Sequence, residues 1–370
     1  MRILQVAEAL DPVHGGVAEG VFQQSVELVR LGHDVEVLSG EPGAVARFAE
    51  HGIPHHAFTP TKMAWRYSPK TLPWLMSNVK RFDAVIVNGL WMHPIYAAAK
   101  ACAKLGVPYY VMPHGMMDPY FKSTTKKKLV KDLYWAMVEK ATFKHCRKVL
   151  FTTLAEQILA SEAYPISHCE KAVVGYGIVD PAPLAAEAGS EALTRFGLSS
   201  GCYDLFMSRV HPKKGLELLV ESVKDSGTKL VIAGNNSGDF ADQIRHRICE
   251  LGVEEQIVWT GFIGGADKWA LLKNARCMVL PSHQENFGII VAEACSLGVP
   301  VLISRKVNTY TEIEAAAAGV ICDDTVESTR EAWKKIANLP ASTKTNARRC
   351  FEENFQIESC TKRFLEAISQ

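Results

Sequence analysis

Two carboxylates eight residues apart stand out in the segment 282–294, which reads Ser-His-Gln-Glu-Asn-Phe-Gly-Ile-Ile-Val-Ala-Glu-Ala. Glu285 precedes a Phe-Gly turn, and Glu293 lies eight residues further on. The apolar run 277–280 comes just before, so the pattern predicts a strand, a polar turn and a helix that begins near Phe287. The first amides of a helix are unpaired and favour an anion. Two carboxylates beside an anion site favour a ligand with phosphate and several hydroxyls, such as a nucleotide sugar.

The alternative interpretation of this segment is structural. Glu285 would then be exposed in a loop, and Glu293 would lie on the surface of an amphipathic helix, as most glutamates do. The neighbours of Glu293 in sequence, among them Val291 and Ala294, are apolar. A carboxylate in such surroundings is costly unless it has hydrogen-bond partners, which favours a functional role.

Two cations follow another predicted strand. Arg209 and Lys214 lie in the segment 208–215, Ser-Arg-Val-His-Pro-Lys-Lys-Gly, directly after the apolar run 205–207. Cations at a strand-to-helix turn can neutralise a diphosphate. Negative charge grows on that group as it leaves, so fixed cations would lower the barrier. An exposed basic turn without function is the alternative.

Two weaker signals come from the first half of the chain. His114 stands between Pro and Gly after the predicted strand 109–112, where it could hydrogen-bond a sugar hydroxyl or move a proton. Gly15 and Gly16 precede a predicted helix over 17–31 and allow a ligand close to the backbone. A structural histidine and a tight turn are the alternatives, and the glycines do not form the GxGxxG dinucleotide fingerprint.

A basic stretch runs from Lys122 to Lys148, with apolar residues between its many lysines. It predicts either a solvated helix face or a surface that meets anionic lipid head groups or a lipid-diphosphate acceptor.

Both halves of the chain alternate short apolar strands with helical segments, which predicts α/β domains with parallel sheets covered on both faces. With 370 residues, two domains are expected. We place them at 1–177 and 178–350, with a C-terminal helix over 351–370 that packs back on the first domain. The segment 180–190 is predicted to be a linker or edge loop. Ligands of such domains bind at the carboxyl ends of the strands.

The composition excludes several classes of protein. The net charge of +1 does not indicate nucleic-acid binding. Ten cysteines without a CxxC pair predict reduced thiols rather than disulfides or a zinc site, and no metal site is expected. Because the chain begins with a strand-like run and no apolar run reaches about 18 residues, we expect a cytoplasmic protein, with peripheral contact to the inner face of the cytoplasmic membrane as one option.

Together these motifs resemble the retaining glycosyltransferases of the GT-B fold with the E-x7-E motif, glycosyltransferase family 4. The family's Gly-Gly opening resembles residues 14–16, its Arg and Lys turn falls on Arg209 and Lys214, and its glutamate motif falls on the segment 282–293. The segments 89–94 and 113–119 resemble a subgroup that builds bacterial exopolysaccharide and O-antigen units. The resemblance implies two Rossmann-like, doubly wound domains facing a central cleft.

The resemblance also implies roles for residues. His114, Arg209, Lys214 and Glu285 would act at the reacting centre. Glu285 would contact sugar hydroxyls, Glu293 the ribose, Arg209 and Lys214 the diphosphate, and His114 the donor sugar. The acceptor would enter near Gly15, Gly16 and His93, and the base would lie near Phe262 and Ile263. The remaining implied substrate-binding residues are Asp118, Asn286, Phe287, Gly288 and Ile289.

The expected activity is retaining transfer of a hexose, such as glucose, from a nucleotide diphosphate, most simply UDP, to a lipid-linked saccharide, without a metal or cofactor. Ser208 replaces the family's usual Gly, and Asn308-Thr309-Tyr310 replaces the subgroup's Thr-Pro-Trp, which puts acceptor or sugar specificity in doubt. The alternatives are a nucleotide-sugar epimerase or hydrolase on the same fold, a non-catalytic sugar-binding protein, and an NAD-dependent oxidoreductase, which the missing fingerprint disfavours.

Overall fold

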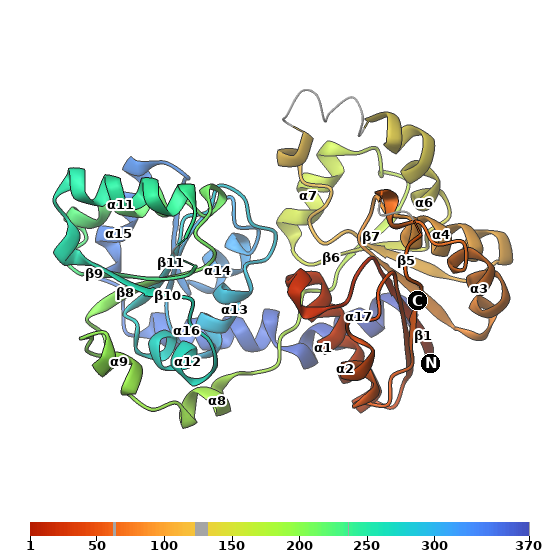
Figure 1. Cartoon of the computed structure of the whole chain (residues 1–370), viewed down its shortest axis with the longest axis horizontal. Helices are drawn as coiled ribbons and strands as arrows, with labels where there is room; N and C mark the ends of the chain where they lie inside the picture. The colour runs from red at the N-terminus through yellow and green to blue at the C-terminus, as the bar shows by residue number, and fades with distance from the viewer. Residues whose placement is uncertain (62–63, 123–131, 236, 370) are drawn as a thin grey trace. The chain divides into compact units, whose positions relative to one another are not determined.

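The computed structural model describes residues 1–61, 64–122, 132–235 and 237–369 (Figure 1). The chain divides into two compact units. Unit 1 comprises Met1–Gly177 and Ile357–Gln370, and unit 2 comprises Ile178–Gln356. The first division coincides with the predicted domain boundary after Gly177. The second lies between Gln356 and Ile357 rather than between residues 350 and 351.

Unit 1 contains a parallel sheet with the strand order β3-β2-β1-β4-β5-β6-β7. Its strands are β1 (Arg2–Ala7), β2 (Asp34–Ser39), β3 (His55–Ala57), β4 (Ala84–Asn88), β5 (Tyr109–Met112), β6 (Lys148–Phe151) and β7 (Glu170–Val173). The order reverses between β1 and β4, and ligands of such sheets bind at the carboxyl ends beside that reversal.

Helices cover both faces of this sheet (Figure 1). They are α1 (Gly16–Arg30), α2 (Val45–Ala49), α3 (Thr71–Asn78), α4 (His93–Leu105), α6 (Lys140–Lys144), α7 (Leu154–Ala163) and α17 (Ile357–Ser369). Shorter turns are η1 (Pro12–His14), η2 (Ala64–Arg66), η3 (Val79–Arg81), η4 (Pro119–Lys122) and the π-helical η5 (Trp135–Glu139). Successive strand residues point to opposite faces, so Ile3 joins the core beneath α1, α2 and α17, and Leu4 joins the core beneath α3, α4 and α6.

The C-terminal helix α17 packs within unit 1, against α1. Phe364 and Ile368 are buried in the core that α1 covers. The Tyr110 hydroxyl donates to the Ile368 carbonyl at 2.8 Å, and Lys148 Nζ donates to the Ala367 carbonyl at 3.1 Å. The helix is therefore part of the first domain's core, although it follows the second domain in sequence.

Unit 2 contains a second parallel sheet, with the order β10-β9-β8-β11-β12-β13. Its strands are β8 (Tyr203–Met207), β9 (Lys229–Ala233), β10 (Ile257–Gly261), β11 (Cys277–Leu280), β12 (Val301–Ser304) and β13 (Gly319–Cys322). Its helices are α8 (Ala182–Glu187), α9 (Glu191–Arg195), α10 (Leu216–Ser222), α11 (Asp239–Leu251), α12 (Gly265–Asn274), α13 (Ile289–Ser296), α14 (Tyr310–Ala316), α15 (Val326–Ile336) and α16 (Ser342–Cys350). Its short turns are η6 (Pro212–Lys214), η7 (Val223–Asp225), η8 (Glu254–Gln256) and the π-helical η9 (Phe351–Phe355). Both units are therefore doubly wound and Rossmann-like, as predicted.

Several local predictions were wrong. The helix after the glutamate loop begins at Ile289, two residues beyond the predicted start, because Gly288 adopts the left-handed conformation and cannot continue it. The segment predicted as a linker contains the helix α8. The predicted helix from 351 onward is a π-helical turn followed by α17.

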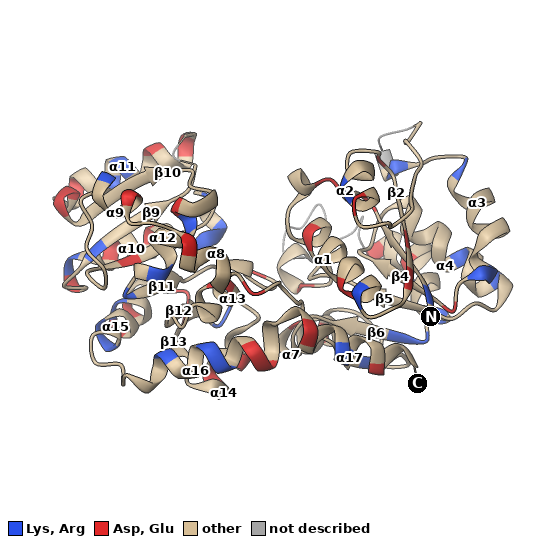
Figure 2. Cartoon of the chain, turned by 90° about the horizontal axis from the view of Figure 1, so that it is seen from below, with Lys and Arg blue, Asp and Glu red and all other residues tan. Residues whose placement is uncertain are grey.

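Acidic and basic side chains both occur on each unit (Figure 2), and the net charge of the chain is +1. In the part of the chain that the structure describes, no helix has the length and apolar character needed to cross a membrane.

Candidate functional site

The two key motifs of unit 2 meet at the reversal point of its sheet. Strand β8 leads into the turn with Arg209 and Lys214, and its neighbour β11 leads into the loop with Glu285. The two loops are in contact: the His283 amide donates to the Lys213 carbonyl at 2.8 Å. The strand order therefore brings together two motifs that are 71 residues apart, measured from Lys214 to Glu285.

Lys214 forms an ion pair with Glu285. Their side chains are only 12% and 21% exposed, so the pair is largely shielded from water. Gly215 lets the two loops approach closely. A Cβ at this position would lie 2.1 Å from the Pro281 carbonyl oxygen, and its φ of +66° also favours glycine. Lys214, the proposed phosphate-binding residue, and Glu285, the proposed sugar-binding residue, are thus adjacent.

Arg209 is exposed in the same turn as Lys214. Among the described residues, no ion pair to Arg209 occurs within 4.0 Å. Its guanidinium is therefore accessible to an anion from solvent.

The backbone of the Glu285 loop is held by the segment after β12. The Glu285 amide donates to the Lys306 carbonyl at 2.9 Å, and the Asn308 amide donates to the Glu285 carbonyl at 3.0 Å. The buried Thr309 hydroxyl donates to the Phe287 carbonyl at 3.1 Å. Asn308 and Thr309, which depart from the subgroup's pattern, thus support this loop.

Asn308 Nδ2 also donates to Asn286 Oδ1, at 3.3 Å. Phe287 is buried and packs edge-on against Phe355 at 5.4 Å between ring centroids, so it anchors the loop rather than facing solvent.

Glu293 lies in the second turn of α13, the helix that follows the loop. Its side chain is 13% exposed, and Lys268 Nζ of α12 donates to its Oε1 at 2.6 Å. Lys268 is the hydrogen-bond partner that a carboxylate in an apolar segment requires. The helix start at Ile289 lies between Glu285 and Glu293, as an anion site between two carboxylates would need.

Phe262 and Ile263 follow strand β10 at the same edge of the sheet. Phe262 is 83% exposed. An exposed aromatic ring at this position could stack on a nucleobase.

His283 ties the glutamate loop to two other elements. Its Nε2 lies 2.5 Å from Glu217 Oε1 in α10, and its Nδ1 lies 3.0 Å from Asp324 Oδ2 after β13. Burial lowers the pKa of His283, but hydrogen bonds to Asp324 and Glu217 outweigh it, so the pKa is raised above 6.5. The ring can donate to both carboxylates only when it is protonated.

We expect the stability of unit 2 to fall as pH rises through the raised pKa of His283. A raised pKa in the folded state adds stability that is complete below the unfolded value of about 6.5 and is lost above the folded value. The Tm of the wild type should therefore be lower at about pH 9 than at about pH 6, and His283→Gln should lack this decrease. His246→Gln, which removes a histidine paired with Glu250 on the surface, is the control. An equal pH dependence in wild type and His283→Gln would contradict this role.

In unit 1, Gly15 and Gly16 lie where β1 passes into α1. Both are exposed, and the space around a Cβ at Gly15 is open, with φ at +81°. The Tyr176 hydroxyl donates to the Gly16 carbonyl. This turn leaves backbone accessible to a ligand, as the glycine pair predicts.

His114 follows β5 and adopts a positive φ of 52°. Its Nε2 lies 2.9 Å from Asn88 Oδ1, at the end of β4. Burial lowers the pKa of His114 to about 4, so the ring is neutral at physiological pH. The buried carboxylate of Glu156 accepts from the Gly115 amide at 2.5 Å and from the Thr152 amide at 2.7 Å, which holds the turn around His114.

His93 begins α4 and is 5% exposed. The rings of Trp65 and Tyr67 lie 5.2 and 4.7 Å from its ring centroid. Among the described residues, its Nδ1 has no hydrogen-bond partner, and burial lowers its pKa. Most buried polar atoms have a partner, so this nitrogen is an exception, and a ligand hydroxyl could reach it only if the side chains that cover it move.

Asp118 accepts from the Tyr120 amide at 2.8 Å and so stabilises the turn before η4. The structure gives it this local role.

The predicted basic stretch lies partly outside the described residues, because 123–131 are not described. Within the remainder, Lys140 and Lys144 are exposed, as are Leu133 and Met137 at 60% and 73%. Lys148 is not on such a surface: it is buried in β6 beneath α17.

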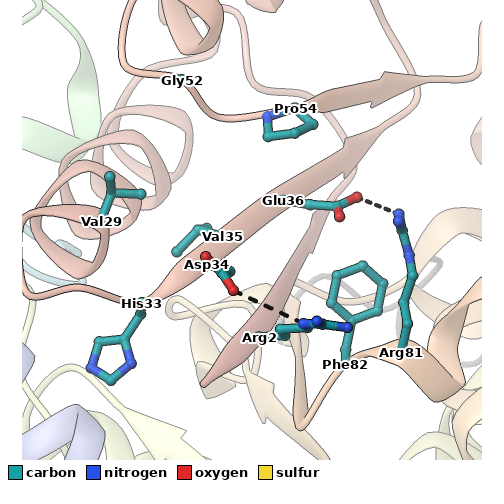
Figure 3. Close-up of a pocket in the computed structure, with 10 residues that line it drawn as sticks. All are labelled: Arg2, Val29, His33, Asp34, Val35, Glu36, Gly52, Pro54, Arg81 and Phe82. Carbon is teal, nitrogen blue, oxygen red and sulfur yellow. Dashed lines mark hydrogen bonds and ion pairs between the residues drawn. The ribbon is translucent and has the colours of Figure 1, made fainter.

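A cavity of about 370 Å³ lies at the amino ends of β1 and β2 in unit 1 (Figure 3). Its charged side chains pair with each other, Arg2 with Asp34 and Arg81 with Glu36. It lies at the edge of the sheet opposite His114 and the glycine pair, so it is not the candidate site.

No cluster of three or more His, Cys, Asp or Glu side chains suited to a metal ion occurs among the described residues.

Known protein families match both halves of the chain. The family described as Glycosyltransferase Family 4 matches residues 14–182, and that described as Glycosyl transferases group 1 matches 203–354. O-antigen chain mannosyltransferase C of Escherichia coli is 23% identical over 97% of this chain and 95% of its own length. A GDP-mannose:cellobiosyl-diphosphopolyprenol alpha-mannosyltransferase of Komagataeibacter xylinus is 23% identical over 92% of this chain and 85% of its own.

The fold is similar to that of Anabaena Alr3699/HepE in complex with UDP. The TM-score is 0.79 at 17% identity, over the whole of both chains. This likeness confirms the predicted GT-B fold class.

Sequence reasoning missed four residues of the site. Asn88 could have been noticed as a polar residue that ends an apolar strand. Thr153 and Glu156 have the Thr-x-x-Glu spacing of a helix capping box, which is a signal for the start of α7 but not for the bond to Gly115. Lys268 and the bridging role of His283 carry no signal in the sequence, because their partners come from other elements.

Proposed function

The chain belongs to glycosyltransferase family 4, and we propose that it transfers a hexose from a nucleotide diphosphate to a lipid-linked saccharide, with retention at the anomeric carbon. The observation that carries this proposal is the contact between Lys214 and Glu285. In a nucleotide sugar, the diphosphate and the sugar hydroxyls lie on either side of the bond that breaks. A cation and a carboxylate in contact match that arrangement.

Each candidate site residue of unit 2 then has a role. Arg209, Lys214 and the first amides of α13 neutralise the diphosphate, and their fixed charges lower the barrier as it leaves. Glu285 accepts from the sugar hydroxyls, with the loop 286–288 beside it, and Glu293 accepts from the ribose. Phe262 and Ile263 lie against the base. Because fixed cations serve the leaving group, we expect transfer to persist when EDTA removes divalent metal.

In unit 1, we assign Gly15, Gly16 and His93 to the acceptor and His114 to a sugar hydroxyl. The open backbone at Gly15 supports this assignment. The Nδ1 of His93, which has no hydrogen-bond partner within the described part of the chain, would bond the acceptor once the side chains that cover it move.

We assign UDP-hexose, with glucose as the simplest case, as the donor. The UDP bound by the structurally similar HepE supports this choice, whereas the two mannosyltransferase relatives support GDP-mannose as a second candidate. Lipid-linked acceptors are supported by the diphosphopolyprenol substrate in the name of one relative.

We also propose that the exposed Leu133 and Met137, with Lys140 and Lys144 nearby, meet the membrane that holds such an acceptor.

Incubation of the chain with UDP-glucose or GDP-mannose, with and without a diphosphopolyprenol-linked disaccharide, tests the reaction class. We expect nucleoside diphosphate release that depends on the acceptor, and a product whose one-bond C–H coupling at the anomeric carbon shows the same configuration as the donor. Release that never depends on the acceptor would contradict transfer and indicate a hydrolase or epimerase. An inverted product would contradict retention alone.

A further inference from the structure

We propose that Gln5 and Asn88 fix the tautomer of His114, so that its Nδ1 remains a hydrogen-bond acceptor for a hydroxyl of the sugar substrate. The substrate contact rests on the proposed function, whereas the tautomer is a property of the free protein. Gln5 and Asn88 are positioning residues in this proposal, because they act through His114.

A chain of side-chain hydrogen bonds crosses the reversal point of the unit 1 sheet. Gln5 Nε2 in β1 donates to Gln24 Oε1 in α1 at 2.8 Å, and Asn88 Nδ2 in β4 donates to Gln5 Oε1 at 2.7 Å. Asn88 Oδ1 lies 2.9 Å from His114 Nε2. Gln5 and Asn88 are 0% and 2% exposed. Four residues from four different segments thus form one network that ends at the histidine.

The direction of this network is set by a main-chain carbonyl. Asn88 Nδ2 also lies 3.5 Å from the Ile86 carbonyl oxygen, which can only accept. The nitrogen of the amide therefore faces Ile86 and Gln5, and the oxygen faces His114. Because that oxygen can only accept, His114 must carry its proton on Nε2. In a neutral ring, Nδ1 then has a lone pair.

Burial keeps the ring neutral, because it lowers the pKa of His114 to about 4. Positive charge grows at the anomeric carbon as the leaving group departs, and a neutral imidazole does not oppose it. The carboxylate of the neighbouring Glu156 binds the Gly115 and Thr152 amides, and Asp118 binds the Tyr120 amide. These carboxylates are therefore engaged with backbone groups of the turn.

The backbone around His114 is held in an unusual conformation. His114 and Gly115 both have positive φ, 52° and 79°, and the Met116 amide donates to the Pro113 carbonyl at 3.1 Å. Backbone in such sparsely populated conformations persists where the surroundings fix it, and it is concentrated at functional sites. The turn thus fixes the backbone from which the ring projects, and the network fixes its tautomer.

The tautomer can be read directly by NMR of the full chain labelled with 15N-histidine, without substrate. His114→Gln identifies the His114 signals by their loss. At neutral pH, we expect a protonated Nε2 and an unprotonated Nδ1 for His114. A protonated Nδ1, or a doubly protonated ring, would overturn the proposal whatever the protein's activity.

The variants Asn88→Asp and Asn88→Leu link this state to turnover. An aspartate accepts the same hydrogen bond but stabilises the imidazolium, so the pKa of His114 should rise and transfer should fall by about 10-fold between about pH 9 and about pH 6. Asn88→Leu removes the acceptor, and we expect a mixture of tautomers and a loss of about 100-fold in kcat/KM.

Asn78→Asp, which alters an asparagine that donates to the Trp74 carbonyl on α3, is the matched control and should keep the wild-type pH profile. A purely structural role for Asn88 would lower activity equally at all pH values and would leave the His114 tautomer unchanged in Asn88→Leu. Either result would overturn the proposal. If the protein transfers no sugar at all, the proposed function fails, and the NMR result still decides the tautomer.

Discussion

Replacing Lys214 by methionine is expected to lower kcat by roughly 100- to 1000-fold. The methionine keeps much of the length of the lysine and removes its charge. The leaving diphosphate then loses a fixed cation in a shielded position, since the Lys214 side chain is only 12% exposed. Glu285, which is 21% exposed, also loses its ion-pair partner and is held less well. Steady-state kinetics with the identified donor and acceptor measure the effect.

Lys213→Met is a matched control for this variant. It makes the same change one residue away in the same turn, where Nζ lies 3.5 Å from Gln284 Oε1. We expect it to retain kcat to within about threefold, because exposed and partly exposed charges contribute little. Equal losses in the two variants would show that the turn contributes only general positive charge. A Lys214→Met variant with wild-type kcat would remove Lys214 from the mechanism.

Replacing Asp204 by alanine is expected to destabilise unit 2 by about 3 kcal/mol. Asp204 lies in β8 and is 0% exposed. It accepts from Arg276 Nε at 2.9 Å, from an Arg276 terminal nitrogen at 2.5 Å and from Trp333 Nε1 at 2.5 Å. The alanine leaves the indole of Trp333 without an acceptor and the guanidinium of Arg276 without its counter-charge.

Hydrogen exchange followed by mass spectrometry can measure this loss in β8 and β11 separately from unit 1. About 3 kcal/mol corresponds to roughly a hundredfold faster exchange in these strands. Asp267→Ala, which removes an exposed ion pair with Arg195, should change exchange by less than about fivefold. Unchanged protection of β8 and β11 in Asp204→Ala would contradict the role of this buried pair.

The fold class and the positions of Arg209, Lys214 and Glu285 could be predicted because each depends on local pattern. Parallel strands that are buried on both faces are short apolar runs, and polar turns after them lie at the carboxyl edge of the sheet. The helix predicted to begin near Phe287 begins at Ile289, because Gly288 adopts the left-handed conformation and is the N-cap.

The contacts around these residues could not be predicted, because they depend on register and on packing between distant elements. Asn88 pairs with Ala7 across β1 and with Met112 across β5, and only this alignment places Gln5 and His114 within reach. Lys268 reaches Glu293 from the neighbouring helix α12. From the sequence alone, Lys148 is expected to be a surface lysine. In the fold it is covered by α17, which lies more than 200 residues later in the chain.

The central claim is that unit 2 holds one nucleotide sugar between Arg209, Lys214, Glu285 and Glu293. Isothermal titration of the full chain with UDP-glucose and with GDP-mannose tests it most directly. One saturable site per chain is predicted for one of these donors, with affinity reduced at least about tenfold in Glu293→Ala, which removes the acceptor proposed for the ribose. Absence of binding for every nucleotide diphosphate sugar, or binding that Glu293→Ala and Lys214→Met leave unchanged, would contradict the claim.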